Sequence, residues 1–498
     1  MSLTAPSAAP VATAGLDGHP RGLTTLFFTE MWERFSYYGM RALLILFMVA
    51  AVSEGGLGFD TKRAAAIYGT YTMSVYLLSI LGGFIADNFI GARRAVFIGG
   101  VIIACGHFSL ACHSLPSFFA GLVLIALGTG LLKPNVSTMV GSLYAPGDER
   151  RDAGFSIFYM GINLGGFLAP LVTGFLAQHS WFKARLASWG FDPAHSWHWG
   201  FAAAGIGMTL GLIQYVRQQS RLASVGQPPA LPTDGSRPWG TLALVALGSL
   251  ALIVILKASD DHPALVYALF AAQIAATLYF AFRPDPASNR MAAILIFFSA
   301  AVIFWSIFEQ AGSTISLFAD QLTRNEVFGQ TFPSSWWQSV GSIMIIVLAP
   351  VFAYLWIKLG SRQPSSPLKF VLGLCFVALS FVLMVPAAKL TLEGRVSPLW
   401  LVGLFFLQTV GELLISPVGL SIMTKLAPPR LTGLVMGIWF LALAFGNKLA
   451  GVLAGSFKND NASQLADFFW HQALLVGVAT LVLFALVPWM KKLMGGVK

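Results

Sequence analysis

The chain has 498 residues and a formal net charge of +10, yet 56% of its residues are hydrophobic and only 10% are charged. Soluble proteins carry roughly a quarter charged residues, so this composition excludes a soluble enzyme or binding module and indicates a membrane protein. The three cysteines show no metal-like spacing, and we therefore expect neither a disulfide framework, nor a metal site, nor a cofactor.

Residues 1–21 are predicted to form a cytoplasmic tail, because they lack the basic start and apolar core of a secretory signal peptide. Beyond them, apolar stretches of about 20 residues, enough to cross a bilayer, recur almost to the C-terminus. We expect fourteen membrane-spanning helices, approximately at 22–52, 61–88, 92–112, 116–139, 150–178, 196–217, 238–257, 262–282, 289–320, 333–359, 367–388, 397–426, 430–456 and 468–490.

Basic residues outside these spans fall mostly on one side of the membrane. With the N-terminus inside, Lys and Arg are about twice as frequent in the cytoplasmic segments as on the opposite side, which is the bias that orients membrane proteins. We therefore expect a multi-pass protein of the plasma (inner) membrane with both termini in the cytoplasm. Topology accounts for the positive charge, so we expect the lipid bilayer as a partner and no nucleic acid.

A faint internal repeat indicates the domain organisation. The second span ends in GGFIADNFIGARR and the tenth in VFAYLWIKLGSR, which share a Gly-x-Arg spacing. We expect an all-α polytopic membrane protein with two six-helix bundles, at 22–217 and 289–498, a common transporter plan. A linker and an inserted transmembrane hairpin fill 218–288; neither hairpin helix has a polar stripe, so we expect the hairpin to be peripheral.

Polar residues in the first span share one face of a helix. Their spacing of i, i+3, i+4, i+7, i+8 and i+11 is helical, and it places them toward a bundle interior or a water-filled cavity rather than toward lipid. The alternative is a buried ion-pair network that only fixes packing. The residues are Glu30, Glu33, Arg34, Tyr37, Tyr38 and Arg41.

Four more charges lie within later spans: Lys133, Glu309, Glu412 and Lys448. Together with the first span they give equal numbers of acids and bases, divided between both bundles. Such pairs can switch when an acid takes up a proton. Lys448 is the weakest member, because it lies near a helix end and is expected to snorkel to the surface.

These residues resemble a known family. Glu30-x-x-Glu33-Arg34-Phe-x-Tyr-Tyr-Gly is similar to the signature of the proton-dependent oligopeptide transporters, a branch of the major facilitator superfamily. The run from Phe158 to Gly165 resembles a second family segment, as do GGFIADNFIGARR, GTGLLKPNVS, FEQAGS, GELLISPVGLS and MGIWFLALAFGN. The motifs extend from the first to the thirteenth span, and the hairpin resembles the extra helices of prokaryotic members.

The resemblance implies proton-coupled symport of di- and tripeptides by alternating access, without a cofactor and with a monomer as the working unit. It assigns the peptide carboxylate to Arg41 and Lys133, and the amino end to Glu412 and Asn163. The implied substrate-contacting residues are Arg41, Tyr37, Tyr38, Tyr76, Lys133, Asn163, Glu309, Glu412, Ser416 and Trp439. The implied proton-linked residues are Glu30, Glu33 and Glu309, with Arg34 and Lys133 as their exchange partners.

Two positions depart from the family pattern. Gly341-Ser342 stands where the family often carries Asn-Pro, so an amide contact to the peptide is expected to be lost or replaced. Gly69 stands where animal members carry a histidine, so proton coupling is expected to depend on carboxylates.

Rival interpretations fit the residues less well. The same fold could carry nitrate or another small solute, but a small anion gains nothing from the negative pole that Glu412 provides. An enzyme is not indicated, because the spans hold no His/Glu metal motif and no Gly-x-Ser-x-Gly elbow. A receptor would be expected to carry a sizeable soluble domain, which the short loops do not provide.

Overall fold

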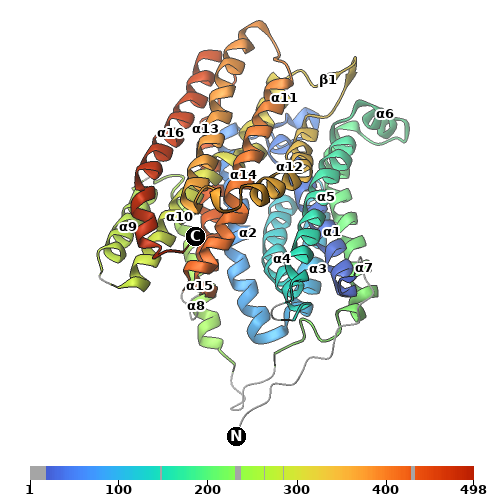
Figure 1. Cartoon of the computed structure of the whole chain (residues 1–498). Coiled ribbons are helices and arrows are strands. Elements are labelled where there is room, and N and C mark those ends of the chain that lie inside the picture. Colours follow the sequence, from blue (N-terminus) through green and yellow to red (C-terminus); the bar gives the residue numbers. More distant parts are fainter. Residues whose placement is uncertain are drawn as a thin grey trace.

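The structure is a computed structural model that describes residues 18–145, 148–229, 237–262, 264–283, 285–427 and 432–497. Most of the predicted N-terminal tail and part of the predicted linker lie outside these ranges. The described chain is almost entirely helical. Figure 1 shows the early helices gathered on one side of the molecule and the late helices on the other.

The N-terminal bundle is built from six long helices and one short one. α1 packs lengthwise against α5 and α7, and α3 packs against α4. Its members are α1 (Arg21–Val49), α2 (Thr61–Ile85), α3 (Ala92–Leu110), α4 (Leu115–Ser142), α5 (Arg150–Gln178), the short α6 (Ser180–Ser188) and α7 (Ser196–Gln218).

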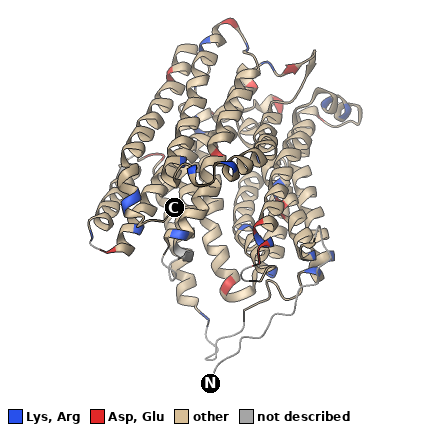
Figure 2. Ribbon diagram, viewed as in Figure 1, with Lys and Arg blue, Asp and Glu red and all other residues tan. Residues whose placement is uncertain are grey.

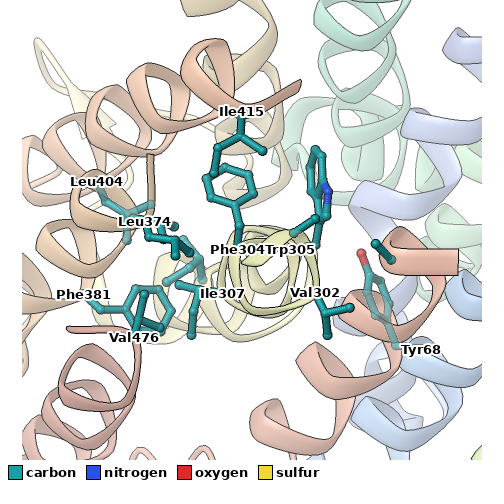
Figure 3. Close-up of a cluster of buried hydrophobic side chains, with 14 of the residues drawn as sticks. Tyr68, Val302, Phe304, Trp305, Ile307, Leu374, Phe381, Leu404, Ile415 and Val476 are labelled. Carbon is teal, nitrogen blue, oxygen red and sulfur yellow. The ribbon is translucent and has the colours of Figure 1, made fainter. Parts of the chain in front are cut away.

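The C-terminal bundle repeats this plan. α10 packs against α13, α15 and α16, and α13 packs against α14 and α16. Phe304 and Ile307 of α10 point into a core with side chains of the neighbouring helices (Figure 3). The members are α10 (Pro286–Phe308), α11 (Thr314–Leu322), α12 (Gln338–Leu359), α13 (Ser366–Leu390), α14 (Leu399–Leu426), α15 (Thr432–Ala454) and α16 (Ala462–Leu493).

Thirteen helical segments of the described chain are long and apolar enough to cross a membrane. α1 is not among them, because Glu33, Arg34 and Arg41 interrupt its apolar stretch, but it runs the length of the bundle between α5 and α7. The predicted all-α membrane architecture of fourteen spans is therefore confirmed. We call the side where α1 begins the proximal side and the side where it ends the distal side.

The inserted hairpin consists of α8 (Trp239–Ala258) and α9 (Ala264–Ala281). Both helices are largely exposed, as expected for a peripheral element. The prediction was nevertheless incomplete, because α8 packs against α2 of the N-terminal bundle while α9 packs against α10 of the C-terminal bundle. The hairpin therefore contacts both bundles.

Three local features were not predicted. The expected span at 289–320 is interrupted, because α10 ends at Phe308, a short 3-10 segment follows at Glu309–Gly312, and the chain continues as α11. α6 and the antiparallel pair of β1 (Glu326–Val327) and β2 (Gln330–Thr331) lie at the distal side. Figure 1 shows both at the same end of the molecule.

Contacts between the bundles hold the distal side closed. On one edge α2 meets α15, where a Cβ on Gly69 would lie 2.9 Å from the Cα of Gly451, so only glycine permits this approach. On the other edge α12 meets α5, where Ser339 Oγ donates a hydrogen bond to the Phe167 carbonyl at 2.7 Å. These contacts join helix halves that lie toward the distal side.

Gly165 of α5 sets the spacing between α5 and α1. A Cβ at this position would lie 2.3 Å from the Met31 carbonyl oxygen and 3.0 Å from the Arg34 Cβ. We predict that Gly165→Val destabilises the bundle by about 1–3 kcal/mol or more, because overpacking forces the helices apart. The control is Gly477→Val on α16, where a Cβ meets nothing within 4 Å. Thermal unfolding in detergent checks this; equal melting temperatures for the two variants would contradict it.

Candidate functional site

Charged residues colour the ends of the helices far more than their middles, with a few exceptions inside the bundles (Figure 2). The first exception is a cluster on α1. Arg34 Nε lies 3.1 Å from Glu30 Oε1, and the same guanidinium forms an ion pair with Glu33. All three side chains are at most 3% exposed, so the predicted polar face of this helix does point into the bundle.

The pairing within this cluster is incomplete. Glu30 Oε2, Glu33 Oε1 and one terminal nitrogen of Arg34 have no hydrogen-bond partner in the described part of the chain. A buried charge is costly unless its polar atoms are satisfied. The free carboxylate oxygens therefore mark positions where a proton, a water molecule or a passing cation would be stabilised.

Lys133 of α4 is a further cation that interacts with this cluster. Its Nζ lies 4.1 Å from the ring centroid of Tyr76 on α2, a cation–π contact. It lies within electrostatic range of Glu30, Glu33 and Arg34. The structure thus brings together two predicted groups, the proton-linked acids and one of the two predicted carboxylate-binding cations.

A second ion pair links the two bundles. Arg41, two turns beyond the first cluster on α1, pairs with Glu309 at the point where α10 breaks. Arg41 Nε also donates a hydrogen bond to the Tyr68 hydroxyl of α2 at 2.5 Å. The break in α10 turns the Glu309 carboxylate toward α1. Figure 3 shows Tyr68 beside Trp305 and Val302, where the N-terminal bundle meets this part of α10.

Glu412 of α14 provides the opposite pole. One of its carboxylate oxygens and the nearby Ser416 hydroxyl, one turn along the same helix face, have no hydrogen-bond partner among the described residues. Glu309, Tyr38 and Tyr159 lie within electrostatic range of this carboxylate. The unpartnered oxygen of Glu412 is therefore a position where a cationic ligand group could pair with the carboxyl group.

Asn163 and Tyr159 belong to α5, on the opposite wall. The Asn163 side chain donates a hydrogen bond to the Tyr159 carbonyl at 3.0 Å, so its amide nitrogen is engaged by its own helix. Tyr159 lies in the family-like run from Phe158 to Gly165, but it was not predicted as a site residue. Its proximity to Glu412 across the bundle boundary is what the sequence could not show.

The predicted aromatic residues lie in different surroundings. Tyr37 and Tyr38 pack edge to face at 5.4 Å on α1, and Arg34 lies 5.2 Å from the Tyr37 ring. Trp439 is only 3% exposed and packs against Phe370. Its place in a side-chain pocket therefore stays a prediction.

The departure at Gly341-Ser342 leaves room beside the site. The nearest atom to a Cβ built on Gly341 is a ring carbon of Phe405 at 4.0 Å, whereas Ser342 Oγ faces Gly166 of α5. Gln408, one turn from Glu412 on α14, is 1% exposed, and neither of its amide atoms has a partner in the described chain. The i, i+4, i+8 spacing of Gln408, Glu412 and Ser416 could have revealed it.

The site as a whole has a cationic group in one bundle and an acidic group in the other. Cations from α1 and α4 lie in the N-terminal bundle, and Glu412 lies in the C-terminal bundle. The described residues contain no group of three or more His, Cys, Asp or Glu side chains placed to hold a metal ion. The site can bind a ligand that carries one negative and one positive end.

Comparisons with known proteins agree with this description. Residues 93–470 match the model of the POT family. The chain is 41% identical to the peptide transporter YePEPT of Yersinia enterocolitica, with 96% of each chain covered. It is 37% identical to a di-/tripeptide transporter of Lactococcus lactis subsp. cremoris, which covers 97% of this chain and 98% of the relative.

A crystal structure of a peptide transporter in complex with alafosfalin superposes with a TM-score of 0.84. It is 41% identical to this chain and covers 97% of it and 98% of the other chain. These relatives are transporters, so the fold and the comparisons place the chain among transporters rather than enzymes.

The Arg34 cluster makes a prediction about stability. Arg34→Met leaves two buried carboxylates without the cation that pairs with them directly, and breaking a buried pair in this way costs about 3–5 kcal/mol. The triple variant Arg34→Met, Glu30→Gln, Glu33→Gln removes all three charges and should recover most of the loss. Melting temperatures in detergent check this ordering. A triple variant as unstable as the single one would show that shape, and not charge pairing, governs the cluster.

Proposed function

The chain belongs to the POT family of proton-dependent oligopeptide transporters, and from that premise we propose that it is a symporter of di- and tripeptides with protons. The observation that carries this proposal is the Glu412 carboxylate of α14, one oxygen of which is buried and has no hydrogen-bond partner among the described residues, while the cations Arg41 and Lys133 belong to the other bundle. Peptides of every sequence share a carboxylate and an ammonium group. A carrier that accepts many peptides needs these two poles.

We propose that the proximal side faces the cytoplasm of a cell whose plasma membrane holds the chain, with both termini inside. The excess of Lys and Arg on that side supports this orientation. The closed distal side is then the external face. In alternating access, the bundles would rock about the site until the distal side opens.

The Arg41–Glu309 pair supports a role for the peptide in this motion. Glu309 pairs with the same Arg41 guanidinium that a peptide carboxylate would contact. A bound peptide and Glu309 would therefore compete for Arg41. Protonation of Glu309 would favour binding of the peptide carboxylate to Arg41, because a neutral carboxyl group binds a guanidinium far more weakly than a carboxylate does.

The Glu30–Glu33–Arg34 cluster supports a second proton site. A proton on either carboxylate would weaken its attraction for Arg34 and alter the balance that Lys133 experiences beside them. The Glu30–Glu33–Arg34 cluster and the Arg41–Glu309 pair both involve α1, and Arg41 is also the proposed ligand of the peptide carboxylate. A proton bound at one of these places therefore changes the charge environment of the others. We propose that this is how proton uptake is coupled to peptide release and binding.

We propose a monomer as the working unit, because both poles and both proton sites belong to one chain. A small anion such as nitrate is a weaker candidate for cargo. It would satisfy the cationic pole but would leave the Glu412 carboxylate buried without a counter-ion, which is unfavourable.

Glu412→Gln tests the peptide pose. Losing one member of a desolvated charge pair costs about 2–5 kcal/mol, which is roughly a 30- to several-thousand-fold loss of affinity. Dialanine binding, measured by competition against a labelled dipeptide, should weaken accordingly. N-acetyl-dialanine has no ammonium group and should bind the variant as poorly as it binds the wild type. Unchanged dialanine affinity in the variant would refute the pose and favour the small-anion alternative.

Proton coupling is tested by separating accumulation from exchange. Glu30→Gln, Glu33→Gln and Glu309→Gln each mimic a permanently protonated carboxyl. In proteoliposomes we expect proton-driven accumulation of dialanine to fail in the variants, while counterflow of labelled dialanine, which needs no net proton movement, survives in at least one. If all three single variants still accumulated dialanine in response to a pH gradient, the proton would have to bind elsewhere.

A further inference from the structure

Lys448 does not snorkel to the surface, contrary to the expectation from its position near a helix end. Its side chain is 4% exposed, and its Nζ lies 2.6 Å from Asp260 Oδ1 and 3.2 Å from the Thr70 hydroxyl. Asp260 belongs to the turn between α8 and α9, Thr70 to α2 and Lys448 to α15. One ammonium group therefore joins the inserted hairpin, the N-terminal bundle and the C-terminal bundle.

The hairpin reaches this position by packing across the boundary between the bundles. A separate hydrophobic cluster contains Met73 and Tyr76 of α2, Leu256 of α8 and Ala444 of α15. The cluster and the ion pair both lie along α2 and α15, where these helices meet. The hairpin turn thus covers the edge at which the two bundles would part.

Packing between the hairpin and the C-terminal bundle is incomplete, although α9 packs against α10. A cavity of about 360 Å³ is lined by residues of α8, α9, α10 and α15, and its walls are almost wholly apolar. Its two polar side chains are Gln273 and Lys448, and both are already hydrogen-bonded. The Lys448–Asp260 pair therefore provides a directional link where the surrounding packing is incomplete.

The location of the pair connects it to the distal closure. Gly451, three residues after Lys448, forms the close backbone contact with Gly69, which directly precedes Thr70. When α2 and α15 separate, the bond to Thr70 must break and water must reach the ammonium group. A buried cation is stable only with a counter-ion. Lys257 and Asp261 are the other charges near it.

We propose that the inserted hairpin stabilises the closed distal side through the Lys448–Asp260 ion pair. The pair takes part in the transport cycle by positioning helices and not by binding the cargo. The pair is separate from the residues that we propose bind the peptide and the protons, because Lys448 bonds to Asp260 and Thr70. It acts by making the closed arrangement of α2 and α15 more favourable than the open one. This inference rests on the alternating access proposed above, but not on the identity of the cargo.

The test measures the distal opening directly. Spin labels at Val52→Cys and Leu392→Cys, which are 73% and 82% exposed, report the distance between the distal ends of the two bundles. The background replaces Cys105, Cys112 and Cys375 by Ser, and the full chain is reconstituted in nanodiscs without peptide. In Asp260→Asn and in Lys448→Gln we expect the population with the longer distance to increase about tenfold, within the usual range of such couplings.

Two controls make the result specific. Asp261→Asn makes the same chemical change one residue away and should leave the distance distribution as in the wild type. The charge exchange Asp260→Lys with Lys448→Asp should return the distribution toward the closed state. Wild-type distances in both single variants, an equal effect of Asp261→Asn, or single-variant effects that the exchange does not reverse would each overturn the proposal. Because no peptide is present, failure of the peptide assignment would not change this reading.

Discussion

A charge inside a membrane protein must find a counter-charge, and most of this structure's functional features follow from that constraint. α1 carries two acids and two arginines through the interior of a bundle. Arg34 is held by Glu30 and Glu33 within the same helix, whereas Arg41 is held by Glu309 from the other bundle. In surroundings of low dielectric, a charge that loses its counter-charge is costly. A proton that neutralises one partner, or a peptide carboxylate or ammonium group that displaces it, therefore requires the other charges to rearrange.

Ion pairs consequently join the two bundles at two places. Arg41 and Glu309 connect them beside the site, and Lys448 connects them at the edge together with the hairpin. Glycine contacts such as Gly69 against Gly451 allow the helices to approach closely there. Close packing gives the closed state its shape, while the role we propose for the ion pairs is to make that state depend on ligand and proton. This combination suits a carrier that must close firmly yet open in response to its cargo.

The length of the apolar stretches was sufficient to predict the fourteen spans, and helical periodicity was sufficient to predict the buried face of α1, because both depend on local pattern. The family motifs located Arg41, Lys133 and Glu412 in the sequence. Pairings between distant segments could not be predicted in this way. The Asp260–Lys448 bond joins residues 188 apart, and the break of α10 at Glu309 has no proline to announce it. Trp439 is buried against Phe370, and its place in a side-chain pocket stays a prediction.

The central claim is that one peptide spans the two poles, and a structure of this chain with bound dialanine tests it most directly. The account predicts that the peptide carboxylate lies against Arg41 and Lys133 in the N-terminal bundle, that the ammonium group lies against Glu412, and that Glu309 has released Arg41. A peptide bound in the reverse orientation, or one bound while the Arg41–Glu309 pair stays intact, would contradict it.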